Sequence, residues 1–133
     1  MIRLATEHDI KQIGKIARQH RAELGFVMNV ALMEAIKTKS LNVFEKDGIV
    51  VGFVHYHPRR DGWKTIHEIA VERTAIREGL GQQLFDSVPK PIRLKTTVEN
   101  VGANKFYLRN GMKLVRMEAG KKRELNVYEL EAH

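Results

Sequence analysis

Two runs rich in apolar and β-branched residues, 41–46 and 49–57, stand on either side of Asp47-Gly48. Asp and Gly tolerate positive φ in a tight turn, so this dipeptide predicts a two-residue β-hairpin. After a short turn, a third run at 63–71 extends the hairpin into a three-stranded antiparallel meander. A chain with a meander at its centre must build its core around an antiparallel or mixed sheet.

The residues before the meander predict one short strand and two helices. The expected ranges are Ile2–Leu4 for the strand, about 7–22 for the first helix and about 29–37 for the second. Thr6 and Asp9 resemble a capping box at the first helix, Gly25 ends it, and Asn29 is expected to cap the second. Four apolar residues of the second helix are expected to face inward: Val30, Leu32, Met33 and Ile36.

The residues after the meander predict two more helices and three strands. The expected elements are a helix that opens at Gly79 and stops before Pro89, a strand at 92–97, a helix at 103–110, and a closing antiparallel pair at 112–117 and 124–130. A helix between the strands at 63–71 and 92–97 implies one parallel crossover. The prediction is an α/β (α+β) sandwich with a mixed, mostly antiparallel central sheet flanked by helices. With no repeat or linker, a single domain over residues 1–133 is expected.

Composition restricts the chemistry. Lysine and arginine number 23 against 16 acidic residues, for a net charge of +7, which favours a polyanionic partner such as nucleic acid or a phosphate-bearing cofactor. The absence of cysteine excludes disulfides, a thiolate nucleophile and cysteine-ligated metal. The longest apolar stretch, Ile49–Val54, is far shorter than the ~20 residues of a membrane helix, and the charged N-terminus is unlike a signal peptide. We therefore expect a cytoplasmic protein without a membrane partner.

The most informative segment is a strand that ends at Val71 and leads into a glycine turn at Gly79-Leu80-Gly81. Glycine lets the backbone approach a ligand, and the amides at a helix start attract phosphate. The turn lacks the Lys-Ser/Thr ending of a P-loop, so that motif is excluded. Leu84 stands where a dinucleotide fingerprint needs its third small residue, which excludes that motif too. A pyrophosphate site and a plain tight turn both fit this motif taken alone.

Three stretches in order resemble the GNAT superfamily of acetyl-CoA-dependent N-acetyltransferases. They are Phe44–Phe53, then Ile69-Ala70-Val71 with Arg77–Gly81, and then Asn100, Ala103, Phe106-Tyr107 and Gly111-Met112. Together they span more than half of the chain, from Leu41 to Arg116. The resemblance implies a GNAT-like fold, acetyltransferase activity and acetyl-CoA as cofactor.

The resemblance also implies a set of residues that hold the cofactor. The backbone of Ile69 and Val71 would pair with the pantetheine arm, and Asn100 would help to hold the cofactor. The amides that would surround the pyrophosphate belong to Arg77, Glu78, Gly79, Leu80, Gly81 and Gln82. The family usually has Gln or Arg where this chain has Ile76, so the adjacent Arg77 is expected to take over that phosphate contact.

Transfer to an amine requires a base and a proton donor for the departing thiolate. Glu68 is the first candidate base and His67 the second, and adjacent strand residues face opposite sides unless a bulge intervenes. Tyr107, which the resemblance places near the cofactor sulfur, is the candidate acid, with Phe106 expected to take the packing position instead. Each of these residues also has a purely structural reading, as a half-exposed strand position or a packed aromatic ring.

Three further residues are candidates for the acceptor site: His55, His57 and Trp63. His55 and His57 share a strand face near His67, but no fourth ligand is evident, so no metal is expected. The hairpin from His55 to Trp63 combines basic and aromatic residues, a combination that suits single-stranded nucleic acid. The alternative is an exposed hairpin tip with Trp63 anchoring its base.

The sequence therefore predicts an N-acetyltransferase that moves an acetyl group directly from acetyl-CoA to a primary amine of a peptide or small molecule. Two alternatives remain open: an enzyme of the same fold that acts on nucleic acid or aminoacyl-tRNA, and a non-catalytic GNAT-fold module. The sequence also leaves open the identity of the acceptor and whether the final strand pairs two subunits into a homodimer.

Overall fold

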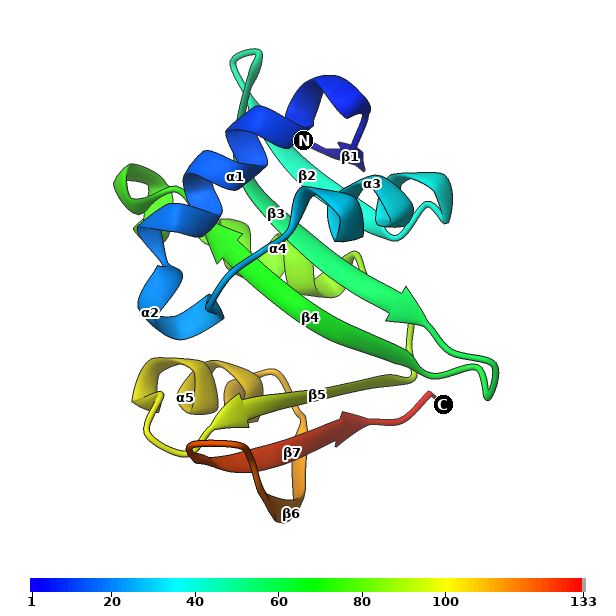
Figure 1. Ribbon diagram of the computed structural model, residues 1–133, viewed down its shortest axis with the longest axis vertical. Coiled ribbons are helices and arrows are strands. Elements are labelled where there is room, and N and C mark those ends of the chain that lie inside the picture. The colour runs from blue at the N-terminus through cyan, green and yellow to red at the C-terminus, as the bar shows by residue number, and fades with distance from the viewer. Residues whose placement is uncertain (133) are drawn as a thin grey trace. The chain divides into compact units, whose positions relative to one another are not determined.

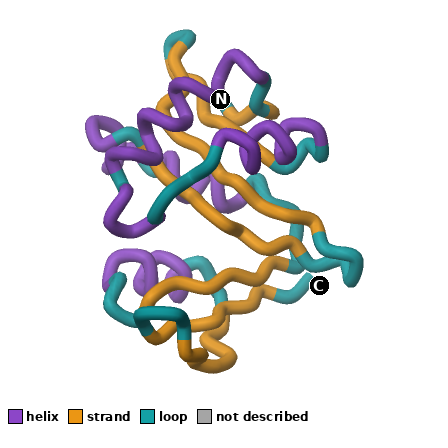
Figure 2. Tube along the Cα trace, viewed as in Figure 1, coloured by secondary structure: helices purple, strands orange, loops and turns teal. Residues whose placement is uncertain are grey.

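The structure is a computed structural model that describes residues 1–132 (Figure 1). In chain order its elements are β1 (Ile2–Leu4), η1 (Glu7–Asp9), α1 (Ile10–Gln19), α2 (Arg21–Leu24), α3 (Asn29–Lys37), β2 (Leu41–Lys46), β3 (Ile49–Pro58), β4 (Lys64–Val71), η2 (Arg73–Glu78), α4 (Leu80–Asp86), β5 (Ile92–Thr97), α5 (Val101–Arg109), β6 (Lys113–Ala119) and β7 (Glu124–Leu130). Figure 2 shows the same trace with helices and strands separated by colour.

The described strands form one sheet in the order β1-β2-β3-β4-β5-β7-β6. The β4–β5 pair is parallel, with Lys64 opposite Ile92, whereas the β1–β2, β2–β3, β5–β7 and β6–β7 pairs are antiparallel. This confirms the predicted fold class and the parallel crossover. Asp47 and Gly48 have φ of 52° and 79°, as a tight hairpin of this type requires.

The described residues divide into two compact units. The first comprises residues 1–57 and 66–88, and the second comprises residues 58–65 and the chain from Pro89 onward. The single domain expected from the sequence stays a prediction.

The first unit has its own apolar core. Ile13, Ile16, Leu32, Val43 and Phe53 are fully buried in it. Both α3 and α4 contact β2, and they cover opposite faces of the strands in this unit (Figure 1). Residues 41–44 are accordingly all buried, as expected of a strand with both faces covered.

The second unit is centred on the antiparallel β5–β7 pair. Its fully buried side chains are Ile92, Leu94, Val127 and Tyr128. The register places Leu94 opposite Tyr128, so two of these side chains come from paired positions. The edge strand β6 is mostly exposed.

The N-terminal helix is interrupted where a continuous one was expected. The capping box is confirmed, since the Thr6 amide donates to Asp9 Oδ2 over 2.8 Å, and the Arg3 guanidinium makes two hydrogen bonds to the same carboxylate. The Arg3 hydrogen bonds lower the pKa of Asp9. The range 7–22 was wrong as a single helix, because His20 adopts φ −113° and ψ 26° between α1 and α2.

Two details of the next helix also differ from expectation. Asn29 is the first residue of α3 rather than its cap, and Met28 at the cap position makes no side-chain hydrogen bond. Val30 is 75% exposed rather than inward. The inward stripe instead consists of Leu32, Ala35 and Ile36, which are spaced as one face of a helix.

Gly52 marks the closest packing in the first unit. A Cβ at this position would lie 2.9 Å from Leu84 Cδ1 of α4 and 3.2 Å from the Ala70 carbonyl oxygen of β4. Only glycine therefore lets β3 lie this close to both α4 and the neighbouring strand β4.

We expect Gly52→Ala to lower the free energy of unfolding by about 1–3 kcal/mol, because the added methyl group overpacks a closed core. The matched control is Gly102→Ala in α5, where nothing lies within 4 Å of the new Cβ and the backbone is helical. That control should be neutral or gain up to about 1 kcal/mol from helix propensity. Urea unfolding checks both, and equal effects of the two changes would contradict the packing argument.

Candidate functional site

The turn after β4 exposes a run of backbone amides. Gly79 ends η2 and precedes α4 with φ 76° and ψ 13°, a left-handed conformation that favours glycine, and a Cβ there would meet nothing within 4 Å. Leu80 and Gly81 follow at the start of α4, where the backbone amides have no acceptor inside the helix. The turn is therefore open to an acceptor-rich ligand.

The charges around this turn are compatible with an anion. Arg77 is exposed. Glu78, the acidic residue of the turn, forms an ion pair with Lys46 of β2, which raises the pKa of that lysine. Ile76 is 53% exposed, so the side chain that departs from the family pattern takes no place in the core.

The end of β4 is fixed by the last turn of α1. His20 Nε2 donates to the Val71 carbonyl oxygen over 2.7 Å, and Gln19 Nε2 donates to Glu72 Oε1 over 2.7 Å. The Arg73 amide donates to Gln19 Oε1 over 3.0 Å, and its guanidinium donates to the Gln19 carbonyl. One lone pair of the Val71 carbonyl, expected to pair with pantetheine, is thus already used.

Glu72 organises the start of the turn. Its side chain accepts hydrogen bonds from the Thr74 amide and hydroxyl, and so caps η2, a helix that the sequence did not predict. Hydrogen bonds from Thr74 and Gln19 lower the pKa of the Glu72 carboxyl to about 2. The capping carboxylate is therefore charged across the physiological range.

The candidate base lies in a histidine-rich cluster on β3 and β4. His55 Nδ1 and Glu68 Oε1 are 2.7 Å apart, and their side chains are only 10% and 16% exposed. The His67 ring centroid lies 5.1 Å from that of His55 and 6.3 Å from that of His57. Both adjacent residues of β4, His67 and Glu68, therefore reach His55, although His67 is exposed and Glu68 is half-buried.

This cluster was only partly foreseen. Glu68, His67, His55 and His57 were each singled out, but His55 was expected to bind the acceptor rather than to pair with Glu68. Within residues 1–132, no group of three histidine or acidic residues is arranged to hold a metal ion.

The other candidates lie on α5 in the second unit. Asn100 accepts a hydrogen bond from the Ala103 amide over 3.1 Å and thereby caps the helix. Tyr107 is buried, with ring centroids 5.4 Å from Phe106 and 5.9 Å from Tyr128. The expectation that Phe106 takes the packing position was wrong, because Tyr107 is the more buried of the two.

A polar network beneath α5 was missed. Asn104 Oδ1 accepts from the Tyr128 hydroxyl over 2.6 Å and from Asn126 Nδ2 over 2.9 Å, while Asn104 Nδ2 donates to backbone carbonyls that include Thr97. The network ties α5 to β7 and the end of β5. Its only signal in the sequence is a polar residue one helical turn from Tyr107.

Trp63 lies at the base of its hairpin. The Arg93 guanidinium stands 4.5 Å from the ring centroid, and the same guanidinium pairs with Asp61 at 3.6 Å and Glu129 at 3.2 Å. One face of the indole is therefore covered by an arginine that two carboxylates hold in place.

Comparison with known proteins decides the family. A family model described as an acetyltransferase (GNAT) domain matches residues 37–113, more than half of the chain. The chain belongs to the GNAT family. This confirms the resemblance found in the sequence and identifies the chain as an acetyltransferase whose cofactor is acetyl-CoA.

Solved GNAT structures share the fold. Ard1 from Thermoplasma volcanium superimposes with a TM-score of 0.86 at 21% identity, covering 98% of this chain and 95% of that one. The ribosomal-protein-S18-alanine N-acetyltransferase from Escherichia coli gives 0.80 at 14% identity, covering 100% and 95%. The protein yncA from Salmonella typhimurium, solved with its cofactor acetyl-CoA, gives 0.78 at 17% identity, covering 98% and 92%. A search of curated protein sequences gave no significant match.

The glycine turn of this GNAT chain suits the pyrophosphate of that cofactor. The space where a Gly79 side chain would stand is open, and the acidic residue beside it is neutralised by Lys46. No helix in the described part of this GNAT chain has the length and apolar character needed to span a membrane. The cytoplasmic location stays a prediction.

Burial raises the pKa of the Tyr107 phenol to about 12. Because the ionised form is disfavoured in the fold, this phenol supports stability fully below about pH 10 and loses that contribution as the pH rises toward 12. We expect the free energy of unfolding of the wild type to fall by about 2–3 kcal/mol more than that of Tyr107→Phe over this range. Denaturant unfolding at several pH values checks this, and parallel pH profiles for the two proteins would contradict it.

Proposed function

We propose that this chain transfers the acetyl group of acetyl-CoA directly to a primary amine, with Glu68 as the base and Tyr107 as the acid. The observation that carries the proposal is the largely buried His55–Glu68 pair, with its 2.7 Å contact between β3 and β4, the strand that precedes the glycine turn. A carboxylate held in one orientation by a neighbouring ring is suited to remove a proton at a defined place.

Glu68 would accept the proton of the incoming ammonium group, since only the neutral amine is nucleophilic. His55 would position it: with the proton on Nδ1, the ring donates to Glu68 Oε1 and leaves the other carboxylate oxygen available. His67, exposed beside His55, is the second candidate base. The sequence proposed three acceptor-binding residues, His55, His57 and Trp63. Because His55 positions Glu68, only His57 and Trp63 keep that role in the proposal.

Tyr107 would protonate the departing thiolate. A phenol with a pKa of about 12 is protonated throughout the working range, so its O–H is available to hydrogen-bond to the sulfur as negative charge develops there. Tyr107 keeps this role in the proposal although it is also a packed aromatic residue.

The cofactor supplies the activated acetyl thioester. The amides of Gly79 to Gln82 would receive its pyrophosphate, because consecutive N–H groups at a helix start concentrate positive potential. Arg77 would make the phosphate contact that the apolar side chain of Ile76 cannot make. Ile69 and Val71 of β4 would pair with the pantetheine arm, and Asn100 would support α5 as its cap.

The acceptor is proposed as a primary amine of a peptide or small molecule. Several proteins of the same fold are described as N-acetyltransferases, including the S18-alanine enzyme of Escherichia coli. The nucleic-acid alternative is not advanced, because Trp63 already packs on Arg93 and so presents less surface for base stacking.

We expect Glu68→Gln to lower kcat/KM for acetyl transfer by about 10²–10⁴-fold with little change in coenzyme A affinity, because the amide cannot accept the proton. The measurement is thiol release with a panel of small amines and peptides, beside calorimetry with coenzyme A. Glu23→Gln on exposed α2 is the control and should retain full activity.

A positioning role for His55 predicts that two substitutions of this residue differ in activity. His55→Asn keeps a donor for the Glu68 carboxylate and should retain more activity than His55→Leu. Equal losses in the two variants, or full activity in Glu68→Gln, would contradict this assignment.

We expect Gly79→Ala to weaken coenzyme A binding about tenfold, because a side chain there strains the left-handed turn and stands where phosphate must approach. Gly62→Ala is the matched control: its φ is 90° and nothing lies within 4 Å of the added Cβ. Both variants should lose similar stability, but only Gly79→Ala should bind coenzyme A less tightly by calorimetry. Unchanged affinity in Gly79→Ala would remove the turn from the proposed site.

A further inference from the structure

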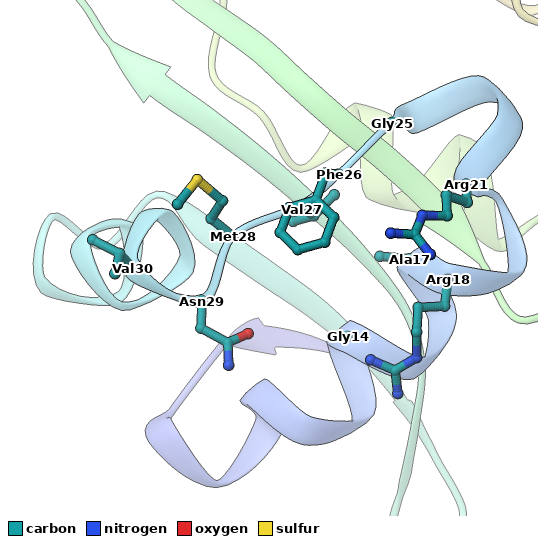
Figure 3. A pocket seen from close by; sticks show the side chains of 10 residues that line it. All are labelled: Gly14, Ala17, Arg18, Arg21, Gly25, Phe26, Val27, Met28, Asn29 and Val30. Atoms are coloured by element: carbon teal, nitrogen blue, oxygen red, sulfur yellow. The ribbon is translucent and has the colours of Figure 1, made fainter.

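A groove in the first unit lies outside the residues assigned so far. It has a volume of about 340 Å³ and runs between one face of α1–α2 and the segment that leads into α3 (Figure 3). Its lining residues are Gly14, Ala17, Arg18, Arg21 and the six residues 25–30.

The helix face of the groove is built from small residues and arginines. Gly14, Ala17 and Arg18 have the three- and four-residue spacing of one face of α1, and Arg21 follows as the first residue of α2. Gly14 and Ala17 leave the space, and a Cβ on Gly14 would already lie 3.4 Å from the Arg18 guanidinium. A larger residue at position 14 would therefore enter the groove.

The opposite wall is apolar and exposed. Phe26, Met28 and Val30 are 76%, 57% and 75% exposed, and they stand at alternate positions of one short segment. In Figure 3 the Phe26 ring lies nearest to Arg18 and Arg21, and Met28 and Val30 lie toward the other end of the groove. Large apolar side chains gathered at a concave surface are typical of a binding site rather than of an ordinary exposed surface.

Among the described residues, no carboxylate neutralises the charge of the two arginines. Within residues 1–132, neither Arg18 nor Arg21 forms an ion pair with a carboxylate. The Arg21 guanidinium lies 5.4 Å from the Phe26 ring centroid, so positive charge and apolar surface are adjacent. Guanidinium groups bind carboxylates in a two-pronged geometry, and the apolar wall selects a hydrocarbon group beside that carboxylate.

The groove also has a physical connection to the cofactor turn. Ala17, Arg18 and Arg21 line it, while Gln19 and His20 between them hold the backbone and side chains of residues 71–73. A ligand that orders this turn of α1 would favour the same arrangement at the end of β4.

We propose that this groove binds a small carboxylate that carries an apolar group, and that its occupancy tightens coenzyme A binding through Gln19 and His20. The volume corresponds to the low end of small-molecule sites and accommodates one amino-acid-sized group. The source of this chemistry is either a free small carboxylate or the C-terminal residue of a peptide. The coupling rests on the proposed function, whereas binding in the groove does not.

The binding test uses N-acetyl-L-leucine, which has the carboxylate and the apolar group but no amine to acetylate. Calorimetry should detect binding to the wild type, and the uncharged N-acetyl-L-leucinamide should bind at least tenfold more weakly. The double variant Arg18→Gln, Arg21→Gln should also bind N-acetyl-L-leucine at least tenfold more weakly than the wild type. Lys11→Gln with Lys15→Gln removes the same charge from positions of α1 outside the groove and should weaken the binding of N-acetyl-L-leucine less than twofold.

A second variant separates binding from folding. Gly14→Leu fills the groove while raising helix propensity, so it should abolish N-acetyl-L-leucine binding without lowering the melting temperature. Binding that survives both Gly14→Leu and the double arginine change would overturn the site, as would the absence of binding to the wild type at millimolar concentrations.

Coupling is tested by titrating coenzyme A with and without saturating N-acetyl-L-leucine. The affinity should rise about fivefold, coenzyme A should tighten the carboxylate by the same factor, and Gln19→Ala should bring that factor toward one. Equal coenzyme A affinities with and without the probe would overturn the coupling.

A blocked tetrapeptide ending in leucine distinguishes the two sources of the ligand. Tighter binding than N-acetyl-L-leucine assigns a peptide C-terminus, and weaker binding assigns a free small molecule. A failure of coenzyme A to bind at all would count against the proposed function and leave the groove measurement intact.

Discussion

Hydrogen bonds from Gln19 and His20 to residues 71–73 hold the point where β4 ends and the glycine turn begins. Much of the proposed chemistry depends on this junction. It directs the chain into η2, which is followed by Gly79 in its left-handed conformation and by the N-terminus of α4. Ala17, Arg18 and Arg21, which flank the residues that make these bonds, also line the apolar groove, so the glycine turn and the groove share one structural support.

The sequence predicted most of the fold because its strongest signals are local. Asp47-Gly48 sets the hairpin, and strands β2, β5 and β7 begin and end at the residues expected. The failures came where a single hydrogen bond, either distant in sequence or local, decides the backbone conformation. His20 leaves the helix and binds the Val71 carbonyl, and η2 follows from the capping carboxylate of Glu72, neither of which has a periodic signature.

The candidate site was predictable by residue type but not by partner. Tyr107 was found from its place in the family pattern and Glu68 as an acidic residue of the third meander strand. The pairing of Glu68 with His55 depends on how β3 and β4 align, which alternation of residues does not fix. The Asn104 network was missed for a similar reason, because its partners come from β7, 22 and 24 residues further along the chain. Between Phe106 and Tyr107, only burial shows which ring is packed.

The central claim is that the backbone amides after Gly79 receive the pyrophosphate of acetyl-CoA. Proton–nitrogen correlation spectra of the labelled protein, recorded while coenzyme A is added, test it most directly. The account predicts that the amide signals of Leu80, Gly81 and Gln82 move furthest downfield, as expected for N–H groups that donate to phosphate. Unmoved signals at these three residues in a protein saturated with coenzyme A would contradict it.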